Sequence, residues 1–288
     1  MKALLDRWNH FWFKPDSAHP AAAFRILMGS YLLVYYLSLI QHVPVLFSSE
    51  GVYVPYIIPD IAPGPAGAWL IYLATVAAYA MLTLGWKPRL AAALSLAGFL
   101  YHYFLYFAVQ NSSYDRLSVI YLLILCFTQS GQVWAVGAKR DPEAMIPIWT
   151  ARIIRFQMII LYFGSGLWKM YNPKWETGRM MKATMTGMWA SPASRAFVDL
   201  DLPMSFWYGF TQSVIYGELL WGALLFFRRT WFLGVAIGIV FHIVNTTLLV
   251  IPWFLVAMVT YPFFIEPPTL RRWVDKVRGR LPGASSPS

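Results

Sequence analysis

The chain has 288 residues, of which 58% are hydrophobic and only 12% are charged. Because an ordinary soluble domain carries about 25% charged residues, this composition excludes a soluble globular enzyme. The aromatic share of 18%, with 14 tryptophans, suits a chain that meets two membrane–water interfaces. The single cysteine, Cys126, excludes a disulfide scaffold. The net charge of +10 is compatible with nucleic-acid binding or with the charge asymmetry of a membrane protein.

Residues 1–20 are mixed and amphipathic and lack the apolar core of a cleavable signal peptide. Apolar runs that can cross about 30 Å of hydrocarbon follow this segment. The predicted spans are 21–40, 68–86, 90–109, 117–133, 148–168, 206–227, 231–249 and 252–265. The fourth is interrupted by Gln129-Ser130-Gly131, and the eighth is short. We expect an all-α bundle of about eight transmembrane helices, with seven to nine allowed.

The spans divide the chain into three parts. We expect a cytoplasmic amphipathic segment over 1–20, a transmembrane domain over 21–266, and a basic cytoplasmic tail over 267–288. The Pro/Gly/Ser-rich end of the tail is expected to be disordered. No separate soluble domain is predicted. The longest outer loop, 169–205, is rich in Met and Trp and is expected to fold over the mouth of the bundle.

The basic residues divide unevenly between the two sides of the membrane. One side, which includes both termini, carries 17 Lys and Arg against 6 acids, and the other carries 6 against 6. The remaining acid, Glu218, lies inside a span. Since cytoplasmic segments are enriched in Lys and Arg, both termini are predicted to be cytoplasmic. The basic charge therefore indicates topology rather than nucleic-acid binding.

The fifth predicted span carries a stripe of polar residues. Arg155, Tyr162 and Lys169 are spaced by seven, nearly two helical turns, and so share one face. Gly166 lies one turn from Lys169 and predicts close approach by another helix or a ligand. A titratable group in hydrocarbon costs about 2.5–3.5 kcal/mol and usually marks a site. The alternative is that Arg155 and Lys169 reach the headgroups at opposite ends of the span.

Two further spans carry titratable residues near their centres. Glu218 lies mid-span in the sixth, where it must be neutral, paired or solvated. His242 lies mid-span in the seventh, with Asn245 one turn farther out on the same face. In an enzyme, Glu218 would tune or pair with His242, although the sequence cannot show whether the pair forms. The alternative for both side chains is a structural hydrogen bond to a neighbouring helix.

Other signals are weaker. His102 lies mid-span in the third span, with Tyr106 one turn on, and we expect a structural role for it. The sequence has no HxxxH, HExxH or Cys/His cluster, so no metal site is predicted. It also lacks GxSxG, Walker A and GxGxxG motifs, which leaves nucleophile-elbow, nucleotide and Rossmann chemistry unsupported.

The order and spacing of several short segments resemble the membrane domain of vitamin K-dependent γ-carboxylases, within the HTTM (horizontally transferred transmembrane) superfamily. The resemblance covers roughly residues 20–265. The matching residues are Phe24-Arg25-Ile26, Asn111-Ser112-Ser113-Tyr114, Pro147-Ile148-Trp149, Arg155-Phe156-Gln157, Tyr162-Phe163, Gly166, Lys169, Trp175, Gly178 and Phe241-His242-Ile243-Val244-Asn245.

The resemblance implies a chemistry. The carboxylases use reduced vitamin K, O2 and CO2 on the non-cytoplasmic side, where a lysine deprotonates the hydroquinone. Lys169 matches that lysine, and the charge distribution independently assigns it to the outer side. The resemblance makes a reduced, vitamin K-like quinone a candidate cofactor without fixing it, and Lys169 and His242 are the expected catalytic residues. The expected substrate-binding residues are Tyr162, Asn245, Trp175, Arg155, Asn111 and Glu218; the aromatic ones could instead form an interfacial belt.

The chain departs from the carboxylases in two ways. Ser112 stands where the family has a functionally important histidine. The carboxylases also carry a large lumenal domain that binds the substrate propeptide, whereas this chain ends just past the membrane part. We therefore do not expect glutamate carboxylation. The resemblance is to stand-alone bacterial members, which implies the cytoplasmic (inner) membrane.

Three functions compete at this stage. The first is an enzyme that uses Lys169 as a base on a quinone or another lipophilic molecule. The second is a non-enzymatic partner or maturation factor for a secreted peptide, for which replacement of Lys169 would be silent. The third is a transporter, with Glu218 and His242 as a proton relay. Inverted repeats with broken helices would support a transporter, and the sequence shows none.

Overall fold

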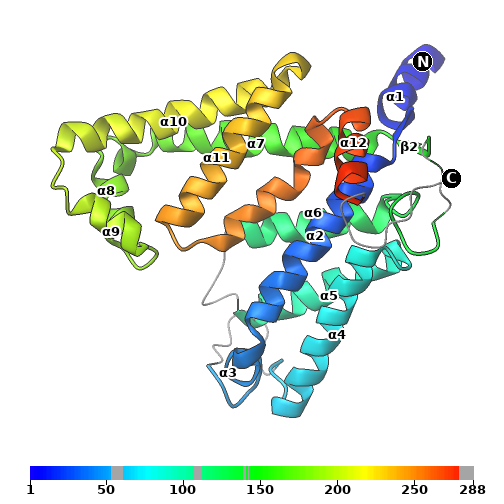
Figure 1. The fold of residues 1–288 in the computed structure, drawn as a ribbon, viewed down its shortest axis with the longest axis horizontal. Helices are drawn as coiled ribbons and strands as arrows, with labels where there is room; N and C mark the ends of the chain where they lie inside the picture. The colour runs from blue at the N-terminus through cyan, green and yellow to red at the C-terminus, as the bar shows by residue number, and fades with distance from the viewer. Residues whose placement is uncertain (53–60, 107–111, 139–140, 142, 279–288) are drawn as a thin grey trace. The chain divides into compact units, whose positions relative to one another are not determined.

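The computed structural model describes residues 1–52, 61–106, 112–138, 141 and 143–278. Their secondary structure is almost entirely helical, as predicted (Figure 1). The chain forms two compact units. The first comprises Met1–Ala151 with Glu266–Ser288, and the second comprises Arg152–Ile265.

The first unit is built on four long helices that follow one another in space as in the chain. Helix α2 packs on α4, α4 on α5, and α5 on α6 (Figure 1). Buried aromatic and aliphatic side chains such as Phe24, Tyr79 and Leu122 fill the space between them. The elements are α1 (Lys2–Phe13), β1 (Pro15–Ser17), α2 (His19–Ser38), η1 (Ile40–His42), α3 (Val43–Phe47), α4 (Pro65–Leu84), α5 (Pro88–Tyr106), α6 (Ser113–Phe127), β2 (Met145–Pro147), the start of α7 (Trp149–Tyr171) and α12 (Pro267–Arg278).

The second unit contains most of α7 and two further long helices, α10 and α11, with α11 packed on both α10 and the 3-10 segment η4. Short helices connect α7 to α10 (Figure 1). The elements after α7 are η2 (Pro173–Trp175), α8 (Arg179–Thr186), α9 (Pro192–Val198), α10 (Met204–Phe226), η3 (Arg228–Thr230), α11 (Trp231–Leu248) and η4 (Pro252–Phe264).

Apolar helices carry large hydrophobic side chains on their outer faces. Val34, Leu70 and Phe232 are 68%, 71% and 81% exposed. Such surfaces are typical of helices that face lipid. By length and composition, three helical segments among the described residues can cross a membrane: His19–Ser38, Pro65–Leu84 and Arg228–Leu248. The described residues thus form an all-α protein in which three helices are long and apolar enough to span a membrane.

The helices agree with most of the predicted spans. Each of α2, α4, α10 and α11 begins and ends within three residues of its prediction. Helix α7 extends three residues beyond the predicted 148–168. The predicted end of the third span, 107–109, lies outside the described residues. The eighth segment, 252–265, forms a 3-10 helix with Pro262 inside it.

The predicted end of the fourth span is wrong. Helix α6 ends at Phe127, because Thr128 adopts an extended conformation and its hydroxyl donates to the Ile124 carbonyl. The buried Arg25 guanidinium donates to the carbonyls of Ser130 and Trp134 at 3.1 and 2.5 Å. The loop after α6 therefore obtains from Arg25 the hydrogen bonds that a helix would have supplied.

A small two-stranded ribbon accompanies the helices. Strand β1 pairs antiparallel with β2, and Asp16 lies opposite Ile146. Nearby in the chain, Arg271 of α12 forms an ion pair with Glu143 at 2.7 Å. The all-α prediction missed the ribbon, since strands of three residues are too short to show alternation. These contacts join the N-terminal segment, the loop before α7 and the C-terminal helix.

Candidate functional site

Two glycines bring α7 and α10 into close contact. A Cβ atom on Gly166 would lie 2.8 Å from Leu219 Cγ, and one on Gly222 would lie 2.9 Å from Phe163 Cβ. Real Cβ atoms almost never approach so closely, so the crossing requires glycine at position 166 of α7 and at position 222 of α10. Small residues at helix contacts are common in membrane proteins. The close approach predicted at Gly166 is confirmed, with a helix as the neighbour.

Next to this crossing, Lys169 of α7 and Glu218 of α10 form an ion pair. Lys169 Nζ lies 2.7 Å from Glu218 Oε1 and 2.5 Å from Oε2, and it also donates to Ser165 Oγ at 2.8 Å. The two side chains are only 13% and 7% exposed. The ammonium of Lys169 therefore points to a carboxylate inside the unit.

An indole ring lies beside the pair. Trp175, in η2, has its ring centroid 5.2 Å from Lys169 Nζ, within the range of a cation–π contact. The indole packs against a cluster of buried residues formed by Met181 and Met185 of α8 and Trp207 of α10. The folded segment between α7 and α10 thus fixes the ring that lies against the ammonium.

A second polar contact lies about 10 Å farther along α7, seven residues from Lys169. Tyr162 Oη is 2.9 Å from His242 Nε2 of α11, and both side chains are buried. The Tyr162 ring stacks on Trp221 with a centroid distance of 3.4 Å and an interplanar angle of 22°. Gly238 makes room for this cluster, because a Cβ there would overlap the Trp221 ring.

The pairing of Glu218 with His242, which the sequence left open, is not formed. Both oxygens of Glu218 bind Lys169, and Nε2 of His242 binds Tyr162. The two contacts lie two helical turns apart on α7, so the carboxylate and the imidazole occupy different levels of the bundle. His242 Nδ1 is buried without a hydrogen-bond partner among the described residues.

The structure places Arg155 away from Lys169. Fourteen residues of helix separate them, about 21 Å along the axis. Arg155 Nε donates to the Phe263 carbonyl at 2.7 Å, and its guanidinium lies 4.4 Å from the Trp231 ring centroid. Arg155 therefore joins the end of η4 and the start of α11 to α7, and its contacts are those of a structural residue.

Of the two asparagines predicted to bind substrate, only Asn245 lies among the described residues. Asn245 Nδ2 donates to the Phe241 carbonyl of its own helix at 3.1 Å. Asn111 lies outside the described residues. Ser112, at the position of the family histidine, is the N-cap of α6. Its hydroxyl accepts from Asp115 N at 3.3 Å, while its own N–H donates to Asp115 Oδ2 at 3.0 Å.

The loop between α7 and α10 is folded onto the second unit. Helix α8 packs on α10, and α9 on α11. The backbone also pairs with the turn that follows α11, since Ser191 N donates to the Leu248 carbonyl and Val250 N to the Trp189 carbonyl. The loop thus covers the end of the unit at which Lys169 lies.

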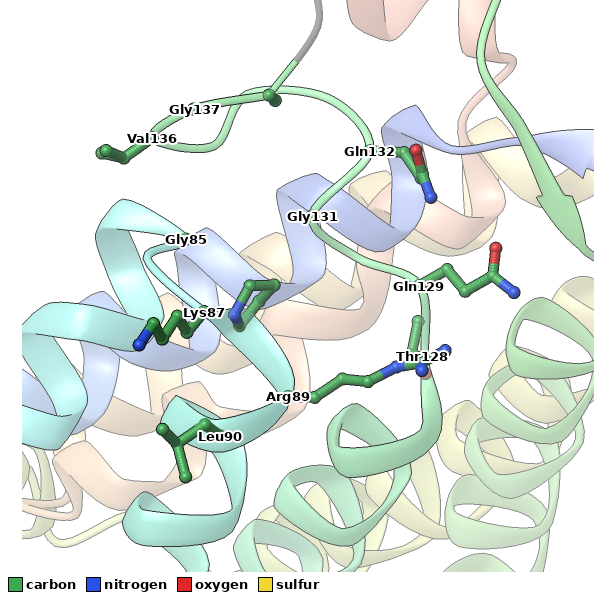
Figure 2. A pocket seen from close by; sticks show the side chains of 12 residues that line it. Gly85, Lys87, Arg89, Leu90, Thr128, Gln129, Gly131, Gln132, Val136 and Gly137 are labelled. Atoms are coloured by element: carbon green, nitrogen blue, oxygen red, sulfur yellow. The ribbon is translucent and has the colours of Figure 1, made fainter.

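A groove in the first unit was not predicted. It has a volume of about 610 Å³ and lies between the α4–α5 turn and the loop after α6 (Figure 2). Its polar lining includes Lys87, Arg89, Thr128, Gln129 and Gln132. The sequence signal was the polar interruption in the fourth span, of which Gln129 and Gly131 line the groove. No cluster of three or more His, Cys, Asp or Glu side chains suited to a metal ion occurs among the described residues.

Comparison with known families identifies the chain. The HTTM domain family model matches residues 13–268, which is most of the sequence. The chain therefore belongs to the HTTM family, in agreement with the resemblance found in its motifs. No solved structure matches it.

Proposed function

We propose that this HTTM protein is an integral membrane enzyme in which Lys169 removes a proton from a lipophilic substrate on the non-cytoplasmic side. The buried Lys169–Glu218 pair is the observation that carries this proposal. A buried ion pair is weak evidence for stability, because desolvation offsets much of the attraction. Ionisable residues within a membrane are instead rare and usually belong to a functional site.

The geometry suggests how the lysine would act. An ammonium must lose a proton before its nitrogen can accept one from a substrate. Both Glu218 oxygens lie within hydrogen-bonding distance of Lys169 Nζ, so the carboxylate can take that proton directly. Transfer yields a neutral amine beside a neutral carboxylic acid, which avoids two charges in a region of low dielectric. Ser165 holds Nζ in place during the exchange.

A reduced quinone is the substrate class that we propose. Its hydroxyl carries the proton to be removed, and the resemblance to vitamin K-dependent carboxylases implies this chemistry at Lys169. The indole beside Nζ offers a flat face for a ring of this kind. Tyr162 and His242 lie deeper and are proposed to orient the substrate, with His242 Nδ1 as a polar atom that the described residues leave unpaired.

We further propose eight spans, with both termini in the cytoplasm of a bacterial cell and Lys169 at the outer end of α7. Contacts within each unit support this topology. The β1–β2 ribbon and the Arg271–Glu143 pair join three segments that the charge distribution assigns to the cytoplasm. The 169–205 loop pairs with the turn after α11, and both are assigned to the outer side.

The test uses purified protein in liposomes supplied with reduced naphthoquinone and O2, with quinone epoxide as the product measured. We expect epoxide from the wild type and none from Lys169→Met. Lys174→Met is the matched control, because Lys174 is an exposed loop lysine five residues away, and it should retain activity. Absence of epoxide from the wild type, or its formation by Lys169→Met, would refute the proposed quinone chemistry.

A second candidate function is that of a membrane partner or maturation factor for a secreted peptide. It is favoured by apolar side chains on the outer loop, where Met188 is 84% exposed, Leu200 63% and Trp189 44%. Exposed apolar groups on a folded loop suit a peptide-binding surface. In this case Met188→Glu would abolish maturation of the peptide while Lys169→Met would leave it intact. The opposite pattern would eliminate this candidate.

A further inference from the structure

A small aromatic cavity lies within the first unit, separate in sequence from the residues of the proposed reaction. Its volume is about 170 Å³. One water needs only about 10–15 Å³, so the cavity can take an organic group. The end of α2, α3, the second half of α5 and the start of α6 surround it. The lining residues are Tyr35, Tyr36, Leu39, Leu46, Phe47, Phe99, His102, Tyr103 and Asp115.

His102, which lines this cavity, carries a buried acceptor atom that has no partner among the described residues. Its side chain is 3% exposed, and Nδ1 lies 2.8 Å from the Gly98 carbonyl. A carbonyl oxygen only accepts, so Nδ1 must carry the proton, and in the neutral ring Nε2 is then an acceptor. Nε2 is buried and has no hydrogen-bond partner among the described residues. Buried polar atoms are nearly always paired, so an unpaired one indicates a missing donor.

The surroundings of His102 are electron-rich. Its ring lies 5.4 Å from the Tyr36 ring and 4.5 Å from the Phe47 ring, measured between centroids. Asp115, on the first turn of α6, adds a carboxylate. One of its oxygens accepts the Ser112 N–H at 3.0 Å, but an ionised carboxylate has about four acceptor positions. The cavity thus combines aromatic faces, a carboxylate and a neutral acceptor nitrogen.

We propose that this cavity binds an organic ammonium group that carries at least one N–H. Each of the three features of the cavity favours binding of such a group. Aromatic faces attract cations, the Asp115 carboxylate forms charge-assisted hydrogen bonds with N–H donors, and His102 Nε2 requires a donor. A neutral alcohol would satisfy His102 but would form no ion pair with the carboxylate. An anion would be repelled by both the carboxylate and the ring faces.

The experiment measures binding by titration calorimetry on the full chain in lipid nanodiscs, with empty nanodiscs as the blank for partitioning. Three probes share one ring: benzylammonium, benzyltrimethylammonium and benzyl alcohol. Benzylammonium carries both the charge and N–H donors, the second probe only the charge, and the third only a donor. We expect one benzylammonium per chain, bound at least about tenfold more tightly than either of the other two.

Two variants assign the contacts. Asp115→Asn removes the charge and keeps an oxygen that can accept the Ser112 N–H, and His102→Phe keeps the ring and removes the acceptor. Each should weaken benzylammonium binding at least about tenfold, while unchanged thermal unfolding verifies that the variant is folded. Lys169→Met/Glu218→Gln, which removes both charges of the buried pair, should bind as the wild type does, and this keeps the cavity distinct from the proposed reaction.

Three results would overturn the proposal. The first is benzyl alcohol binding as well as benzylammonium, which would make the cavity merely apolar. The second is equal binding of benzyltrimethylammonium, which would show that no N–H is needed. The third is undiminished benzylammonium binding by the two folded variants, which would place the ligand elsewhere.

Discussion

The Lys169–Glu218 pair makes a strong prediction about stability. Lys169→Met leaves a carboxylate that is 7% exposed with no ammonium beside it. Removing one partner of a buried pair costs about 3–5 kcal/mol, because the remaining charge stays desolvated. Glu218→Gln should cost a similar amount, since the buried ammonium would keep only neutral neighbours: Ser165, the Trp175 ring and the amide oxygen of the new side chain. The double variant buries no charge and should be more stable than either single variant.

The assay is a double-mutant cycle. The free energy of unfolding is measured by denaturant titration in detergent micelles for the wild type, both single variants and Lys169→Met/Glu218→Gln. Independent sites add within about 0.3–0.5 kcal/mol, whereas these two should deviate from additivity by several times that amount. Lys174→Met provides the baseline for losing an exposed lysine. Additive effects of the single variants would refute the claim that the two side chains share one buried contact.

A different substitution of Lys169 separates its effect on the stability of the fold from its effect on epoxide formation. Lys169→Arg keeps a cation that matches the geometry of the Glu218 carboxylate, but a guanidinium does not give up its proton in proteins. We expect this variant to be more stable than Lys169→Met and yet to form no epoxide. Activity in a folded Lys169→Arg protein would contradict a role for Lys169 as a base.

Further predictions test the neighbouring contacts and the topology. Tyr162→Phe leaves His242 Nε2 unpaired and should lower the free energy of unfolding by about 1–3 kcal/mol; no loss would contradict this contact. Gly166→Leu forces α7 away from α10 and should cost about 1–3 kcal/mol or more, which thermal unfolding would reveal. In a chain without its native cysteine, Met188→Cys should react with a membrane-impermeant thiol reagent on intact cells. Arg229→Cys should react only after permeabilisation, and the reverse pattern would invert the topology.

The positions of the helices could be predicted because the thickness of the bilayer fixes the length of an apolar run. Hydropathy does not show where backbone hydrogen bonding changes. The helix before Thr128 ends at the polar Gln129-Ser130-Gly131 segment, and Arg25, more than a hundred residues earlier, binds the carbonyls of the loop that follows. The 3-10 geometry of η4 could not be predicted either, because apolar composition alone does not distinguish a 3-10 helix from an α-helix.

The partners within the site were harder to predict than the residues themselves. Helical periodicity places Lys169 and Tyr162 on one face of α7 and does not give their level relative to another helix. Counting from the span ends put Glu218 at mid-membrane beside His242. The first turns of α10 are instead used by the folded loop, because Trp207 and Phe210 pack with α8. The middle of α10 therefore lies beside the end of α7, where Glu218 contacts Lys169.

The position of the Lys169–Glu218 pair bears on whether it is structural or reactive. A pair kept only for stability could be replaced by apolar residues of similar volume at little or no cost, and the glycines at the α7–α10 crossing would suit such packing. The loop instead places the pair at the last turn of α7, with an indole against Nζ. There it lies within reach of molecules entering from the outer side in the proposed topology. An active wild type and an inactive, fully folded Lys169→Met/Glu218→Gln protein would identify the pair as reactive, and unchanged epoxide formation by that double variant would show that it is structural.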